Sequence, residues 1–139
     1  MNRIRKQIEG IASLYGLQII YAFGSRAKEA LDMVDGRIKR LSGTSSDLDI
    51  GVKPLMPMTV EDKIRVAILF EDLFDVNRVD LIVLPEAPVS LASEIVTGEI
   101  LYAKDQTFEA DYQLYILRQA ADLFPYEQMK LEMIFGGPS

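Results

Sequence analysis

Helical and strand patterns alternate along the whole chain, and this alternation is the feature that most constrains the fold. Helical spacing of apolar residues predicts helices over about residues 2–15, 26–34 and 59–74, then over 89–96 and from 107 onward. Short apolar or alternating runs predict strands over 17–23, 47–52, 79–84 and 100–103. Thr59 and Asp62 have the spacing of a capping box at the start of the third helix. Such a chain is expected to form an α/β domain.

The length of the chain suits one domain with a single core over residues 1–139. Residues 35–46 contain two glycines, four Ser/Thr residues and three basic residues, so we expect a loop or an insertion there. No apolar run approaches the roughly 18 residues of a membrane span, and Met1-Asn2-Arg3 does not open a signal peptide. We therefore expect no membrane association and a cytoplasmic location.

Two residue types are missing from the sequence, and their absence narrows the possible chemistry. Without cysteine there are no disulfides, thiolate nucleophiles or cysteine–zinc sites. Without histidine there are no Ser–His triads and no imidazole metal ligands. A general base or a metal ligand must therefore come mainly from aspartate or glutamate.

The charges are distributed unevenly along the chain. The formal net charge of −6 argues against a general nucleic-acid-binding surface. Residues 1–46 hold eight Lys/Arg against four Asp/Glu, whereas residues 47–139 hold seven against seventeen. This arrangement suits an anionic ligand with its metal counter-ions, but charge asymmetry alone more often marks a solvated surface of mixed charge.

Three aspartates are the strongest candidates for a functional site. Asp47 and Asp49 lie two residues apart on a predicted strand, so their side chains are expected on one face. Asp80 stands near the start of an apolar strand, where an ionised carboxylate needs a partner or a metal. Together they suit Mg²⁺, which prefers a few carboxylates plus phosphate oxygens. An ordinary half-exposed strand, with Asp80 paired to Arg78, fits the same pattern.

A Gly-Ser turn follows the first predicted strand. Gly24 allows the backbone to approach a ligand closely, and the amides at the start of the next helix attract phosphate. Ser25 either donates to a phosphate oxygen or caps that helix. Basic residues that can compensate a triphosphate follow: Arg26, Lys28, Arg37, Lys39 and Arg40. A solvated loop is the alternative reading of this basic set.

Taken in order, three segments resemble the polymerase-beta-like nucleotidyltransferase superfamily. They are Phe23-Gly24-Ser25-Arg26-Ala27, Ser46-Asp47-Leu48-Asp49-Ile50 and Val79-Asp80-Leu81. In particular, the chain is similar to the minimal nucleotidyltransferase (MNT) antitoxins that pair with HEPN-domain ribonuclease toxins, and residues 95–102 resemble the C-terminal part of that group. The resemblance implies the nucleotidyltransferase fold, in which helices flank a small mixed β-sheet and a long helix ends the chain.

The resemblance also implies an activity, namely transfer of AMP from ATP to a hydroxyl, here a tyrosine of a HEPN-type toxin partner, with two Mg²⁺ ions. Asp47 and Asp49 would bind both ions, Asp80 would complete the site, and Gly24, Ser25 and Arg26 would bind the nucleotide. Two departures stand out. Glu29 replaces a glycine usual in the family, and 21 residues separate Ser25 from Asp47, more than is usual. An insertion at about residues 31–44 would explain both.

Two other functions fit the same sequence. One is a non-catalytic module that neutralises a partner by contact alone. The other is a nucleotidyltransferase for a small molecule such as an aminoglycoside, although the chain leaves little room for a separate acceptor-binding domain. The intact set of three aspartates favours an enzyme over the non-catalytic module.

The C-terminal helical segment, about residues 107–135, carries two apolar stripes. One consists of Phe108, Tyr112 and Tyr115, and the other of Leu114, Leu117, Ala121 and Phe124. A helix lying on a sheet needs only one stripe, so the second indicates either a contact with the partner or a second copy, or further core. Pro125 is predicted to end or kink this helix, with an apolar tail after it: Tyr126, Met129, Leu131, Met133, Ile134 and Phe135.

Overall fold

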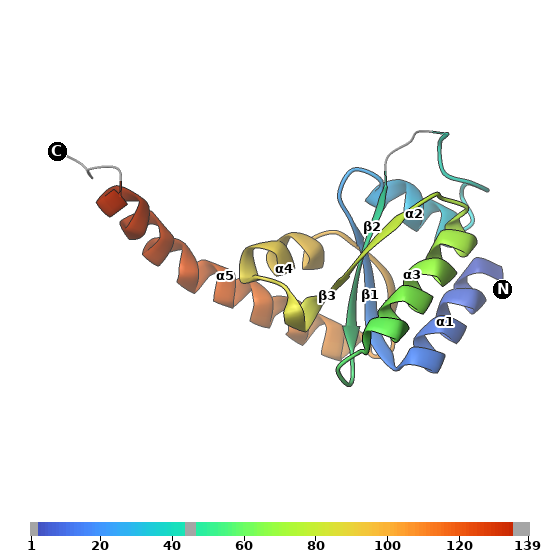
Figure 1. The fold of residues 1–139 in the computed structure, drawn as a ribbon, viewed down its shortest axis with the longest axis horizontal. Helices are drawn as coiled ribbons and strands as arrows, with labels where there is room; N and C mark the ends of the chain where they lie inside the picture. Colours follow the sequence, from blue (N-terminus) through green and yellow to red (C-terminus); the bar gives the residue numbers. More distant parts are fainter. Residues whose placement is uncertain (1–2, 44–46, 135–139) are drawn as a thin grey trace.

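The computed structural model describes residues 3–43 and 47–134, with side chains as far as residue 123. Its helices are α1 (Arg3–Tyr15), α2 (Ala27–Val34), α3 (Val60–Phe74), α4 (Val89–Val96) and α5 (Gln106–Ile134). Its strands are β1 (Leu17–Phe23), β2 (Leu48–Pro54), β3 (Val79–Val83) and β4 (Glu99–Ala103), and a 3₁₀ turn, Leu84–Glu86, follows β3. Figure 1 shows the sheet between two groups of helices.

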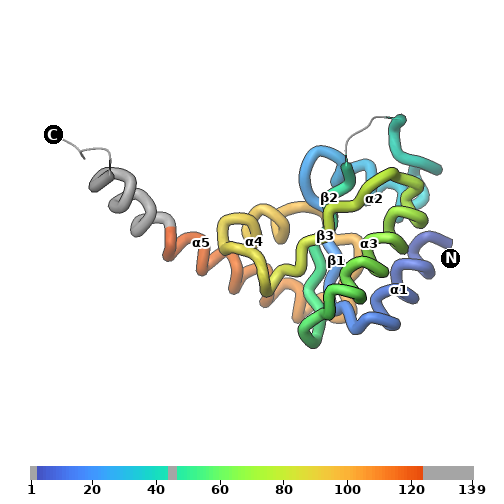
Figure 2. The backbone as a smooth tube through the Cα atoms, in the orientation of Figure 1, coloured from blue at the N-terminus to red at the C-terminus, as the bar shows by residue number. Residues whose placement is uncertain are grey.

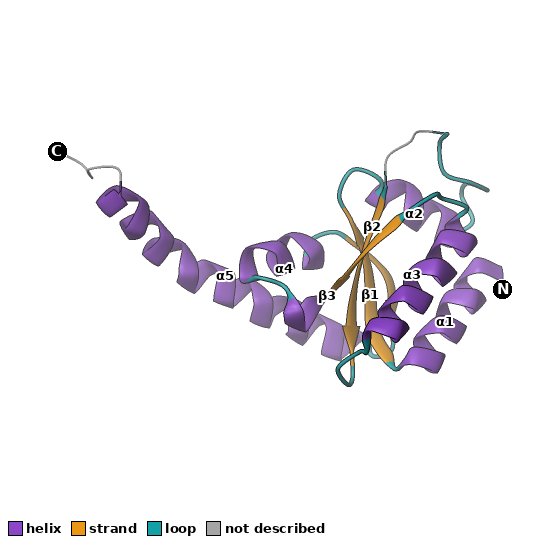
Figure 3. Cartoon of the chain, in the orientation of Figure 1, coloured by secondary structure: helices purple, strands orange, loops and turns teal. Residues whose placement is uncertain are grey.

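The four strands form one mixed sheet in the order β3-β2-β1-β4. The strand β1 lies inside the sheet and runs antiparallel to both β2 and β4. β3 runs parallel to β2, joined to it by the crossover helix α3. The predicted α/β fold with a small mixed sheet is therefore confirmed (Figure 3).

Each face of the sheet has its own core. On one face Ile20 and Ala22 of β1 pack with residues from α1, α2 and α3. On the other face Ile19, Tyr21 and Phe23 pack with α4 and α5. Because β1 is covered on both faces, its sequence is almost continuously apolar, as expected for an interior strand.

The strand β2 differs from its prediction at both ends. It begins at Leu48, so Asp47 lies just before the strand instead of on it. It continues to Pro54, two residues beyond the predicted end, because Pro54 pairs with Leu17 at the last position of the β1–β2 ladder. A proline is tolerated at the end of a strand since few ladder hydrogen bonds depend on its missing N–H. The predicted helix cap is confirmed: the Thr59 hydroxyl accepts a hydrogen bond from the Asp62 backbone N–H at 3.1 Å.

The long C-terminal helix is present as predicted, but Pro125 does not end it. α5 continues to Ile134, because a proline removes only one hydrogen bond from a helix of 29 residues. Figure 2 traces α5 alongside α4. Phe108 and Tyr112 pack against the second core, whereas Tyr115 remains 56% exposed. The predicted apolar tail (Tyr126, Met129, Leu131, Met133, Ile134 and Phe135) lies outside the described side chains.

No helix in the described part of the chain is both long enough and apolar enough to cross a membrane.

Candidate active site

The centre of the candidate site is a pair of aspartates on neighbouring strands. β2 and β3 are parallel, and their register places Asp49 directly opposite Asp80. The carboxyl group of Asp80 lies close enough to raise the pKa of the Asp49 carboxyl group. Two acidic groups so close to each other repel when both are ionised, unless a cation lies near them.

The environment of Asp49 opposes its ionisation. Burial raises the pKa of its carboxyl group, and the negative charges of Asp80, Asp47 and Glu94 raise it further. The other two sequence-predicted aspartates, Asp47 and Asp80, therefore both act electrostatically on Asp49. A bound cation would remove this penalty, so the donor set suits a hard metal ion such as Mg²⁺.

The guanidinium group of Arg78 contacts two of the three aspartates. Its Nε donates to Asp80 Oδ1 at 3.1 Å and lies 3.8 Å from Asp47 Oδ2. Asp47 and Asp80 therefore both contact Arg78. Within residues 3–43 and 47–134, no three acidic side chains converge closely enough to hold one metal ion. The carboxylates of Asp49 and Asp80 are ligands of the kind that Mg²⁺ prefers, and the strand register places them side by side. In this structure Arg78 supplies a positive charge next to Asp47 and Asp80.

The Gly-Ser turn lies against this carboxylate pair. Gly24 and Ser25 are exposed between the end of β1 and the start of α2. Gly24 has a φ of +77°, and a Cβ atom added there would lie 2.5 Å from Asp49 Oδ2. Arg26, and not Ser25, is the N-cap residue of α2, so the capping interpretation of Ser25 is wrong. The backbone of the turn thus lies in close contact with the Asp49 carboxylate, which a side chain at position 24 would disturb.

Arg26 is buried and holds a loop in place. Only 4% of its surface is exposed. Its Nη2 donates to the Ser42 carbonyl at 2.7 Å, and its Nε lies 3.5 Å from Glu29 Oε2. Glu29 Oε1 in turn accepts from the Ser42 backbone N–H at 3.0 Å. Hydrogen bonds from Ser42, together with Arg26, lower the pKa of Glu29.

The residue that replaces the usual glycine therefore has a structural partner. Glu29 fastens residues 35–43, which follow α2, onto that helix. This contact joins the first departure seen in the sequence, Glu29, to the loop that contains the second. Arg26, which the sequence predicts to bind the nucleotide, contacts the loop at Ser42 in this structure.

Sequence reasoning missed Glu94, whose charge reaches Asp49 from α4. The position of α4 depends on Gly51 in β2: a Cβ atom there would lie 2.4 Å from Ile95 Cγ2. A glycine inside a strand is a recognised sign of such close approach, so Gly51 was the available signal. No local pattern connects Glu94 itself to the aspartates.

The fold and the site define a nucleotidyltransferase domain, and comparison with known families agrees. Residues 6–107 match the family model described as polymerase beta, nucleotidyltransferase. The chain belongs to this polymerase beta nucleotidyltransferase family. A search of curated proteins found no match.

Several solved structures share the fold over almost the whole chain. The toxin–antitoxin MntA–HepT is 20% identical with a TM-score of 0.67, covering 95% of this chain and 97% of that one. A toxin–antitoxin with AMP-PNP is 21% identical with a TM-score of 0.68, covering 94% and 98%. The tri-AMPylated Shewanella oneidensis HEPN toxin in complex with MNT antitoxin is 20% identical with a TM-score of 0.67, covering 95% and 96%. At these identities the similarity shows the fold.

Proposed function

We propose that this protein is an antitoxin that transfers AMP from ATP to a tyrosine hydroxyl of a HEPN-type toxin. The observation that carries the proposal is the register of β2 and β3, which places Asp49 opposite Asp80 beside the Gly24 turn. Relatives of this fold add support, since one is a toxin–antitoxin with AMP-PNP and another is a complex of an MNT antitoxin with a tri-AMPylated HEPN toxin. We place the reaction in the cytoplasm, and we assign the whole chain to one domain with an insertion at about 31–44.

Two Mg²⁺ ions held by Asp47, Asp49 and Asp80 would neutralise charge on the phosphates and on the attacking oxygen. The chain's own residues do the rest. Gly24 and Ser25 hold the β- and γ-phosphates through backbone amides and the hydroxyl. Asp80 accepts the proton of the acceptor hydroxyl, because the sequence offers no histidine for this role.

The bond changes are those of a single displacement. The acceptor oxygen forms a bond to the α-phosphorus of ATP, and the bond from that phosphorus to the oxygen bridging to the β-phosphate breaks. Pyrophosphate leaves with the electron pair, and the acceptor proton goes to the Asp80 carboxylate. Arg78 Nε donates to one oxygen of this carboxylate, Oδ1, which leaves its other oxygen for the proton.

The test uses the full chain, a HEPN-type toxin as the candidate partner, and ATP labelled in the α-phosphate. We expect Mg²⁺-dependent labelling of that partner. A general base contributes roughly 100-fold or more to such a rate, so Asp80→Asn should lose at least about that factor. Asp72→Asn, at an exposed position on α3 away from the proposed site, is the matched control and should label at the wild-type rate. Neutralisation of the partner without ATP or Mg²⁺ would instead show an antitoxin that works by contact alone.

A further inference from the structure

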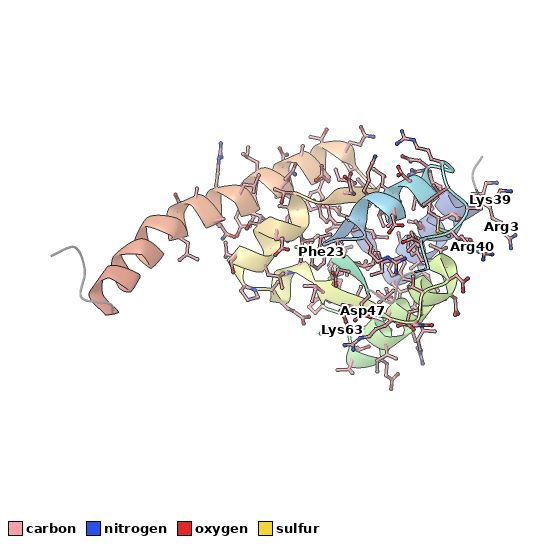
Figure 4. The ribbon with its side chains drawn as sticks, turned by 90° about the horizontal axis from the view of Figure 1, so that it is seen from above. Arg3, Phe23, Lys39, Arg40, Asp47 and Lys63 are labelled. Atoms are coloured by element: carbon pink, nitrogen blue, oxygen red, sulfur yellow. The ribbon has the colours of Figure 1, made fainter. Side chains whose placement is uncertain are left out.

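A pocket of about 550 Å³ lies at the free edge of β4, away from the candidate active site. β1 separates this edge from β2 and β3, where the aspartates gather. Figure 4 shows the first turns of α5, which border the pocket, on the opposite side of Phe23 from Asp47. The lining comes from α1, β4 and α5, and it includes Arg5, Glu9, Ile100, Tyr102, Gln106 and Glu109.

One group of this lining, Glu109, is a carboxylate that is almost completely buried. Only 6% of its surface is exposed. Its Oε2 accepts a hydrogen bond from the Tyr21 hydroxyl at 2.7 Å, and no other group among the described residues donates to its side chain. In the part of the chain that the structure describes, every completely buried side-chain oxygen has a hydrogen-bond partner. The Oε1 atom of Glu109 is therefore accessible from the pocket that it lines.

The negative charge of Glu109 has no counter-ion. Among residues 3–43 and 47–123, no Lys or Arg forms an ion pair with it. Tyr21 donates a hydrogen bond but no charge. Arg5 also lines the pocket, but its Nη2 lies 2.6 Å from Asp35 Oδ1 and its Nη1 donates to the Leu101 carbonyl at 3.4 Å. Because a buried carboxylate is costly unless an opposite charge lies near it, the pocket favours a cation.

A second carboxylate and an apolar surface belong to the same lining. Glu9 is exposed on α1 and forms no ion pair with a described Lys or Arg. Ile100, which is 39% exposed, and Tyr102 add apolar surface from β4. Since Asp35 neutralises Arg5, the lining carries two uncompensated negative charges.

The size of the pocket selects the kind of cation. Its volume lies within the roughly 300–1,000 Å³ that is typical of sites for small organic ligands. No three acidic side chains within the described residues converge on one metal ion. Two carboxylates beside an apolar surface therefore suit an organic molecule with two positive groups joined by a hydrocarbon chain.

We infer that this pocket binds a linear aliphatic diamine, with one ammonium group against Glu109 and the other toward Glu9. The methylene chain contacts Ile100 and Tyr102, and a tyrosine ring also attracts ammonium groups. A lysine or arginine side chain of another protein carries one positive charge, so it would leave one of the two carboxylates uncompensated. The bound diamine links α1 to α5 across the edge of β4, and it stabilises the folded chain by mass action.

The first test is a calorimetric titration of the full chain with butane-1,4-diamine. Glu109→Gln keeps an oxygen that accepts from Tyr21 but removes the charge, so it should weaken binding about tenfold. Glu9→Gln, at an exposed position, should weaken binding by about twofold to fivefold. Asp111→Asn removes the same charge from an exposed position of α5 outside the lining, and it should change binding by less than about twofold.

The second test changes the ligand. Butylamine has one ammonium group, so it should bind the wild type about twofold to fivefold more weakly than the diamine, and Glu9→Gln should not weaken it further. Butane-1,4-diol, which carries no charge, should not bind. This comparison needs only the wild type and the exposed Glu9 variant, so it decides the inference even where Glu109→Gln lowers the melting temperature too far for titration.

Four results would overturn the inference. They are no diamine binding by the wild type, equal losses in Glu109→Gln and Asp111→Asn, displacement of the diamine by Mg²⁺, which would assign the pocket to a metal ion, and butylamine binding as tight as that of the diamine. The last result would assign the pocket to a single basic side chain of a protein. None of these measurements involves AMP transfer, so their outcome is independent of the proposed function.

Discussion

Replacing Gly24 with alanine separates the two tasks that this residue performs. Its φ of +77° lies in the left-handed region, where a residue with a Cβ atom costs about 1–2 kcal/mol. The new Cβ atom would lie 2.5 Å from Asp49 Oδ2, so the Asp49 side chain must also turn away from its position opposite Asp80. We therefore expect a modest loss of stability and a separate, larger loss of Mg²⁺–ATP affinity.

Gly16 offers a matched control for the backbone cost. Its φ is +65°, but a Cβ atom added there meets nothing within 4 Å. Gly24→Ala and Gly16→Ala should both lower the melting temperature by roughly 3–10 °C, since each costs about 1–2 kcal/mol. Only Gly24→Ala should weaken Mg²⁺–ATP binding, by about tenfold or more, as typical when the support of a metal site is disturbed. Equal nucleotide affinity in the two variants, measured by calorimetry, would refute the assignment of Gly24 to the site.

Three further predictions concern packing, pH and assembly. Gly51→Ala should cost about 1–3 kcal/mol in chemical denaturation, because its Cβ atom would lie 2.4 Å from Ile95 Cγ2; an unchanged midpoint would show that α4 can shift freely. Burial and the Glu109 hydrogen bond raise the pKa of Tyr21 above its ordinary 10.0, so above about pH 10 the unfolded chain ionises first and stability should fall. Tyr21→Phe should flatten that fall in pH-dependent unfolding while costing about 1–3 kcal/mol, since the buried Glu109 loses its donor. Truncation after Pro125 should reduce co-purification with the partner or self-association by solution mass; unchanged assembly would exclude this segment as an interface.

The elements of the fold were accessible to sequence analysis because each has its own local periodicity. The capping box at Thr59 and the buried run of β1 are examples, and both are confirmed. Pro125 did not mark the end of α5. The rule that proline ends a helix considers only the neighbouring residues and takes no account of the length of the helix on either side.

The candidate site could be predicted only in part from local sequence patterns. Sequence spacing brought Asp47, Asp49 and Asp80 together as a set, but their register depends on the parallel pairing of β2 with β3. The Glu29–Ser42 contact joins residues 13 positions apart across an irregular loop, so no periodic pattern reveals it. The role of the three aspartates as metal ligands stays a prediction.

The position of β1 inside the sheet has a consequence for biosynthesis. Its partner on one side, β2, ends at Pro54, but its partner on the other side, β4, begins only at Glu99. A nascent chain therefore carries a long apolar strand with one open edge until β4 has left the ribosome. Open strand edges template pairing with other chains, so this interval is the period when the protein most needs a chaperone.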